Sequence, residues 1–210
     1  MLTINFLGDS ITEGALASTQ EDTFVYRVGK MLPCIARNYG ISGTRIARQF
    51  TPSQDPRYDL DFVRRIDDLD KEADFVVVFG GTNDYGHGDA PFGNLDDDGE
   101  DTFCGCLNAL FKKLLNFYKK EQIIVIPPLY RIGENNPYGD GSKKEPGEPL
   151  SSYREVIIDL GNFYGVHILN IAEEFGRAEG NSLIADGLHP NSQGHLKIAQ
   201  LICDYINKLI

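Results

Sequence analysis

The chain has 210 residues, 41% hydrophobic and 10% aromatic, and this size and composition predict one folded domain, residues 1–210, with a well-buried core. Its formal net charge of −11 argues against nucleic acids and anionic membranes as partners, because proteins that bind phosphates gather lysine and arginine. The apolar opening 1–7 is only as long as a strand, so it predicts neither a secretory signal nor a membrane span, and a cytoplasmic protein is expected.

Short apolar runs bounded by glycine, asparagine or proline predict five buried strands. In chain order these runs are 2–7, 34–39, 75–79, 123–126 and 166–169. Apolar residues at helical spacing lie between them, most clearly in 103–115 and again in 196–209. Alternating strands and helices predict an α/β fold, in which a five-stranded parallel sheet lies between two layers of helices.

Ligands of such sheets bind beyond the carboxyl ends of the strands. Two polar stretches, 85–101 and 131–150, each follow a strand at that edge and are longer than usual connections. They predict walls or lids of a site. Tyr85, His87 and Tyr130 are candidate substrate contacts there, suited to a sugar or a small alcohol, although each side chain is also explained by loop packing.

A serine follows the first predicted strand, in the block Gly-Asp-Ser-Ile-Thr-Glu-Gly at 8–14. Ser10 is therefore expected at the end of a buried strand, where a helix begins. Unpaired N–H groups at a helix start can stabilise an oxyanion, which suits a nucleophile. The structural alternative is that Ser10 only caps the helix.

Hydrogen-bond donors follow the second and third predicted strands. The block Asn-Tyr-Gly-Ile-Ser-Gly at 38–43 allows tight backbone turns near a ligand, with the N–H of Gly43 as a donor. The block Gly-Gly-Thr-Asn-Asp at 80–84 presents the neutral amide of Asn83 at the same edge. Each block taken alone also fits an ordinary turn.

A carboxylate and an imidazole lie three residues apart in the block Asp-Gly-Leu-His-Pro at 186–190. Asp186 and His189 are expected to hydrogen-bond within a short turn. Pro190 biases His189 away from helical geometry, so the imidazole is expected on an extended loop before the last helix. A structural histidine at a helix start is the alternative.

These four blocks, in this order, resemble those of the SGNH hydrolases, also called the GDSL family, which includes esterases, lipases, thioesterases and carbohydrate acetylesterases. The resemblance runs from Gly8 to His189, and its one departure from the namesake motif is Ile11 in place of leucine, which touches no catalytic role. The G-x-S-x-G elbow of ordinary α/β-hydrolases is absent, since Thr12 stands where the last glycine is needed.

The resemblance implies a flavodoxin-like three-layer fold and a serine esterase with Ser10, Asp186 and His189 as catalytic residues. It further implies an oxyanion hole formed by the N–H groups of Ser10 and Gly43 and the amide of Asn83. No cofactor or metal is implied. The expected partner is a small-molecule ester with a short acyl group, such as acetyl, on a neutral or carbohydrate carrier, and the oligomeric state stays open.

Two other functions remain open at this stage. In a metal-dependent hydrolase, Asp9, Asp84, Asp186 and His189 would converge on a cation, whereas in the esterase Asp9 would hold the loop or contact substrate. A non-catalytic binding protein on the same fold is the second alternative. The acidic run 96–101 lacks the glycine offset of a calcium loop, and the four scattered cysteines are expected to be reduced packing residues.

Overall fold

Five strands form one sheet in the computed structural model, which describes residues 1–210. They are β1 (Leu2–Gly8), β2 (Cys34–Gly40), β3 (Phe75–Phe79), β4 (Ile123–Ile126) and β5 (His167–Ile168). Their order across the sheet is β2-β1-β3-β4-β5, and every neighbouring pair is parallel. The predicted five-stranded parallel sheet is therefore confirmed, in the order of flavodoxin-like sheets.

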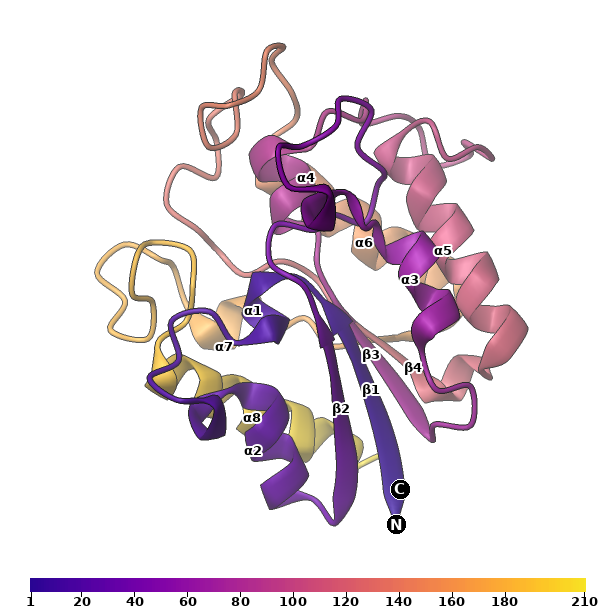
Figure 1. Ribbon diagram of the computed structural model, residues 1–210, viewed down its shortest axis with the longest axis vertical. Coiled ribbons are helices and arrows are strands. Elements are labelled where there is room, and N and C mark those ends of the chain that lie inside the picture. Colours follow the sequence, from indigo (N-terminus) through magenta and orange to yellow (C-terminus); the bar gives the residue numbers. More distant parts are fainter.

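Helices cover both faces of the sheet (Figure 1). One face carries α1 (Ser10–Glu13), α2 (Phe24–Met31), α7 (Ala172–Phe175) and α8 (Ser192–Ile206). The other carries α3 (Phe62–Arg65), α5 (Phe103–Phe117) and α6 (Leu150–Tyr164), while α4 (Thr82–His87) lies beyond the carboxyl end of β3. Single turns of 3-10 helix occur at Gln20–Asp22, Pro56–Asp59, Ile66–Asp68 and Lys120–Gln122.

Two hydrophobic clusters, one on each side of the sheet, explain why β3 and β4 read as unbroken apolar runs. The edge strands β2 and β5, expected from the sequence to be buried, contain no fully buried residue, because each has a neighbouring strand on one side only. In β3 all five residues are buried, with Val76 and Val78 in the cluster under α5 and α6, and Phe75, Val77 and Phe79 in the cluster under α2 and α8. A strand that is buried on both faces has no polar side to show in its sequence.

Three element boundaries differ from the sequence-based expectation. The stretch 85–101 does not begin as a loop, because Gly81 adopts φ +103° and α4 starts directly after it, continuing to His87. The fifth strand has only two residues, and β4 is its only neighbour in the sheet. Val166 was expected to belong to this strand, but its N–H donates to the carbonyl of Gly161 at the end of α6. The last helix starts at Ser192, where the Asn191 side chain caps it.

No helix of the structure has both the length and the apolar character needed to cross a membrane. All four cysteines are free thiols, and three of them are buried. Burial raises the pKa of the Cys106 thiol to about 12, as expected of a packing residue.

Candidate active site

Ser10 lies where β1 turns sharply into α1. Asp9 is the N-cap of this helix, and its carboxylate accepts the N–H of Ile11 at 3.0 Å, so Ser10 is the first helical residue and not the cap. The turn is possible because position 8 has no side chain: a Cβ on Gly8 would come within 2.0 Å of the Thr12 hydroxyl. This sharp turn places Ser10 at the carboxyl end of β1, where the residue is 7% exposed.

Ser10, His189 and Asp186 form a continuous chain of side-chain contacts. The Oγ of Ser10 lies 2.9 Å from Nε2 of His189, and Nδ1 of His189 lies 2.8 Å from an oxygen of Asp186. The serine and the histidine are 179 positions apart in the sequence and meet because β1 and the 186–190 turn end at the same edge of the sheet.

The turn that carries His189 is tightly organised. One oxygen of Asp186 accepts the N–H groups of Leu188 at 3.0 Å and of His189 at 2.7 Å. Gly187, which lies between Asp186 and Leu188, adopts φ +85°. Partial burial alone would raise the pKa of the Asp186 carboxyl, but the hydrogen bonds from His189 and Leu188 outweigh it and lower the pKa below its ordinary value. Asp186 is thus ionised at neutral pH and fixes the orientation of the imidazole.

Gly43 lies on the loop after β2, and its N–H donates to no acceptor in the protein. Polar groups on either side of it are engaged in hydrogen bonds. The N–H of Ser42 donates to Glu13 at 2.8 Å, and the hydroxyl of Thr44 donates to the carbonyl of Ile41 at 2.6 Å. Gly43 itself adopts φ +75°, a conformation that favours glycine.

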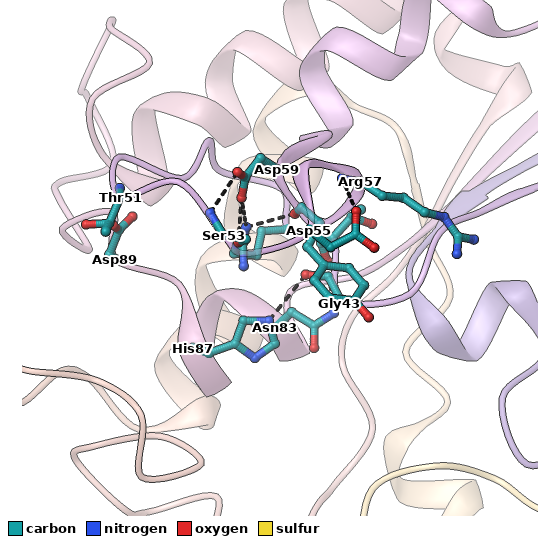
Figure 2. Close-up of polar contacts among 12 residues, drawn as sticks. Gly43, Thr51, Ser53, Asp55, Arg57, Asp59, Asn83, His87 and Asp89 are labelled. Carbon is teal, nitrogen blue, oxygen red and sulfur yellow. Dashed lines mark hydrogen bonds and ion pairs between the residues drawn. The ribbon is translucent and has the colours of Figure 1, made fainter.

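Helix α4 holds this loop in place (Figure 2). The amide of Asn83 donates to the carbonyl of Thr44 at 2.9 Å, which uses one of its two protons and fixes the side chain beside Gly43. Asp84 accepts the N–H groups of Ala47 at 2.8 Å and of Ile46 at 3.0 Å. The structure therefore brings Gly43 and Asn83 together, as the sequence blocks predict.

Asp9 is 1% exposed and lies under the site as the helix cap, so the structure does not present it to a substrate. Loss of hydration raises the pKa of its carboxyl to about 7, against smaller lowering effects of the Ile11 N–H and of His189. Both oxygens of Asp84 are taken by backbone N–H groups, and no three His, Cys, Asp or Glu side chains are grouped to hold a metal ion. The arrangement proposed for a metal-dependent hydrolase has no geometric support.

The three expected wall residues have different surroundings. Tyr85 is turned into the core, and its single hydroxyl proton lies within reach of the carbonyls of Gly133 and Asn136 in the 131–150 segment. Tyr130 lines a separate pocket of about 300 Å³, where the guanidinium groups of Arg154 and Arg177 lie over its ring. Only His87 reaches the site, where it contacts the carbonyl of Gly43.

Arg65, for which the sequence predicts no role, is a buried residue that holds together the segments around the site. It is 4% exposed and donates to the carbonyls of Gly8 and Tyr39 and to the hydroxyl of Thr44. It therefore ties the ends of β1 and β2 to the Gly43 loop. In the sequence it is one of two adjacent arginines of a short helical segment, and nothing there marks it as the buried one.

Comparison with known proteins gives the same assignment of fold. The sequence matches the model of the GDSL-like lipase/acylhydrolase family over residues 6–197. The structure is similar to that of a protein from Lactobacillus plantarum, with 27% identity and a TM-score of 0.80 over 99% of this chain and 97% of that one. It is also similar to a lipase/acylhydrolase from Enterococcus faecalis, with 21% identity and a TM-score of 0.70 over 98% and 95% of the two chains. No curated protein matches the sequence.

Proposed function

Since the chain belongs to the GDSL-like lipase/acylhydrolase family and is a carboxylic ester hydrolase, we propose that it cleaves its substrate with Ser10 as nucleophile, through an acyl-enzyme intermediate. The observation that carries this proposal is the chain of contacts from Ser10 through His189 to Asp186, at 2.9 and 2.8 Å. Nucleophile, base and orienting carboxylate in that order are what serine acyl transfer needs.

In the first half of the reaction, Oγ of Ser10 forms a bond to the ester carbonyl carbon while Nε2 of His189 takes its proton. The tetrahedral intermediate then breaks its bond to the alcohol oxygen, which leaves with that proton. Water, activated by the same imidazole, releases the acid and restores Ser10. The ionised Asp186 stabilises the imidazolium that forms in each half.

The oxyanion of the intermediate needs hydrogen-bond donors that are free before the substrate arrives. Gly43 offers an unpaired N–H, and Ser10, as the first residue of α1, offers a second one that no carbonyl within the helix can take. Asn83 adds its remaining amide proton. Each such donor contributes roughly 3 kcal/mol to lowering the barrier.

A panel of variants tests these roles. Ser10→Ala and His189→Ala are expected to abolish nearly all turnover of a p-nitrophenyl ester while circular dichroism shows an intact fold. Asp186→Asn is expected to lower kcat by about 10²- to 10⁴-fold, because the amide cannot stabilise the imidazolium. His167→Ala is the matched control, since His167 contacts Tyr205 and none of the three proposed catalytic residues. Substantial turnover by the Ser10 variant would rule out the nucleophile.

For the substrate, we propose a short acyl group, acetyl foremost, on a neutral carrier such as a carbohydrate. The net charge of −11 disfavours anionic esters, and the stretches 85–101 and 131–150 contain no long apolar run to cover a fatty chain. A series of p-nitrophenyl esters from acetate to dodecanoate is expected to give the highest kcat/KM at acetate. A maximum at the long chains would contradict the proposal.

A further inference from the structure

The two backbone donors of the proposed oxyanion hole lie on different segments, Ser10 on α1 and Gly43 on the loop after β2. Glu13, the last residue of α1, connects these segments. One oxygen of its carboxylate accepts the N–H of Ser42 at 2.8 Å and also the hydroxyl of Ser42, which has no other hydrogen-bond partner. No other side chain of α1 hydrogen-bonds to this loop, so Glu13 is the direct link between the nucleophile's helix and the residue before Gly43.

The loop forms a four-residue turn at 41–44, with Gly43 as its third residue. The N–H of Thr44 donates to the carbonyl of Ile41 at 3.3 Å, and φ is +75° at Gly43 but not positive at Ser42, which is the signature of a type II turn. That turn type sets the direction of the Gly43 N–H within the turn. The peptide that carries this N–H has no hydrogen bond at either end, so its position depends on the residues that anchor the turn.

The other oxygen of Glu13 pairs with Arg57, which lies in the single turn of 3-10 helix at Pro56–Asp59. The next residue, Tyr58, packs its ring against Gly43, where a Cβ would come within 2.8 Å of the ring. Figure 2 shows this turn, with Arg57, beside Gly43. Glu13 therefore holds both the residue that precedes Gly43 and the turn that covers it.

The charge of Glu13 is offset by its own partner. Partial burial alone would raise the pKa of the Glu13 carboxyl, but the hydrogen bonds from Ser42 and Arg57 outweigh it and lower the pKa below its ordinary value. The carboxylate is thus ionised at neutral pH and paired with the guanidinium of Arg57. Since the arginine balances its charge, the contribution of Glu13 to the site is expected to come from the bonds it makes and not from its charge.

We propose that Glu13 is a positioning residue, whose carboxylate sets the distance between the N–H groups of Ser10 and Gly43 by fixing Ser42 to the helix that carries the nucleophile. This inference rests on the proposed function of Ser10 and Gly43. Ser10 and Glu13 are three positions apart in one helical turn, so a bond to Glu13 places the loop relative to the nucleophile itself. The first residue of the turn is anchored separately, by its N–H to the carbonyl of Gly8 at 3.1 Å, so the loop is expected to stay folded without Glu13.

Three variants of Glu13, measured as purified full-length protein with p-nitrophenyl acetate, test the inference. Glu13→Ala is expected to lower kcat about tenfold or more with KM changed by less than about twofold, because a loosened donor stabilises the transition state less. Glu13→Gln keeps the length and an oxygen that can accept both groups of Ser42, so kcat is expected to stay within about threefold of the wild type. Glu13→Asp keeps the charge but is one methylene shorter, so it is expected to lose kcat as Glu13→Ala does. A charge effect would give the reverse order of these last two variants.

Asp22→Ala is the matched control. Asp22 also accepts a hydroxyl, from Thr19 at 3.0 Å, and pairs with an arginine, Arg27, at 2.5 Å, but these contacts involve neither α1 nor the Gly43 loop. This variant is expected to keep the wild-type kcat. Urea unfolding of each variant shows that the kinetics are measured on folded protein. A merely structural tie would lower stability in Glu13→Ala and leave kcat of the folded protein unchanged.

Labelling of Ser10 by a fluorophosphonate in each protein separates the two proposals. If the wild-type serine is labelled but folded Glu13→Ala keeps a wild-type kcat, or if Glu13→Asp is faster than Glu13→Gln, the role of Glu13 is refuted and Ser10 stands. A loss of kcat in Asp22→Ala equal to that in Glu13→Ala refutes it as well. If the wild-type serine is not labelled, both proposals fall.

Discussion

Among the single residues of the site, Asp9 shows most clearly how burial changes the chemistry of a carboxyl group. Its pKa rises from 3.8 to about 7 because the folded protein removes it from water. Between these two values the native protein holds a proton that the unfolded chain has released. The unfolded state therefore binds fewer protons, and the contribution of Asp9 to stability decreases as pH rises through this range.

Asp9→Asn is expected to remove this pH dependence, because asparagine also caps helices well and does not titrate. Urea unfolding of both proteins at about pH 5 and about pH 8 measures it: the variant should gain stability relative to the wild type at the higher pH. A stability difference that is the same at both pH values would show that Asp9 does not hold its proton in the folded state.

The elements of the fold were predictable where burial leaves a pattern in the sequence. Residues 75–79 are apolar throughout because both faces of β3 are covered, and α5 shows helical spacing because one side of it faces the sheet. The placement of Ser10, Gly43, Asn83 and His189 after β1, β2, β3 and β5 could likewise be inferred, since parallel strands bring their carboxyl ends to one edge.

The side chains of the loops could not be predicted, because their direction depends on partners distant in the sequence. Tyr85 points into the core, where its hydroxyl lies within hydrogen-bond distance of the carbonyls of Gly133 and Asn136. Tyr130 lines a separate pocket, where the guanidinium groups of two arginines lie over its ring. No local pattern distinguishes either from a tyrosine that faces a substrate.

The attachment of α4 to the Gly43 loop also yields a prediction. Asp84→Ala leaves the N–H groups of Ile46 and Ala47 without their buried acceptor, which is expected to lower the free energy of unfolding by about 1–3 kcal/mol. It is also expected to lower kcat, because the same loop carries Gly43.

Asp89→Ala is the matched control for this variant. Asp89 accepts the N–H groups of Phe50 and Thr51 in the same loop, but its side chain is exposed. These two N–H groups lie farther along the chain from Gly43 than the two that Asp84 accepts. Urea unfolding and steady-state kinetics of the two variants separate the effects. If Asp84→Ala were destabilised like this control and kept a wild-type kcat, the hydrogen bonds of Asp84 would have no role in the site.

At the scale of the whole molecule, the net charge of −11 acts on any charged substrate that approaches. The value of kcat/KM for an ester with a carboxylate on its acyl chain is expected to rise with added salt, because salt screens the repulsion. The value for a neutral ester such as p-nitrophenyl acetate should stay nearly constant. Equal responses of both esters to salt would show that the charge does not influence substrate choice.

The central claim, that His189 activates Ser10 as a nucleophile, is tested most directly by labelling with a fluorophosphonate and mapping the modified peptide by mass spectrometry. Such a probe reacts with an activated serine whatever the natural substrate is. The structure predicts that Ser10 alone is labelled in the wild type and that labelling disappears in folded His189→Ala. A folded wild-type protein that is not labelled, or a His189→Ala variant labelled at the same rate, would contradict it.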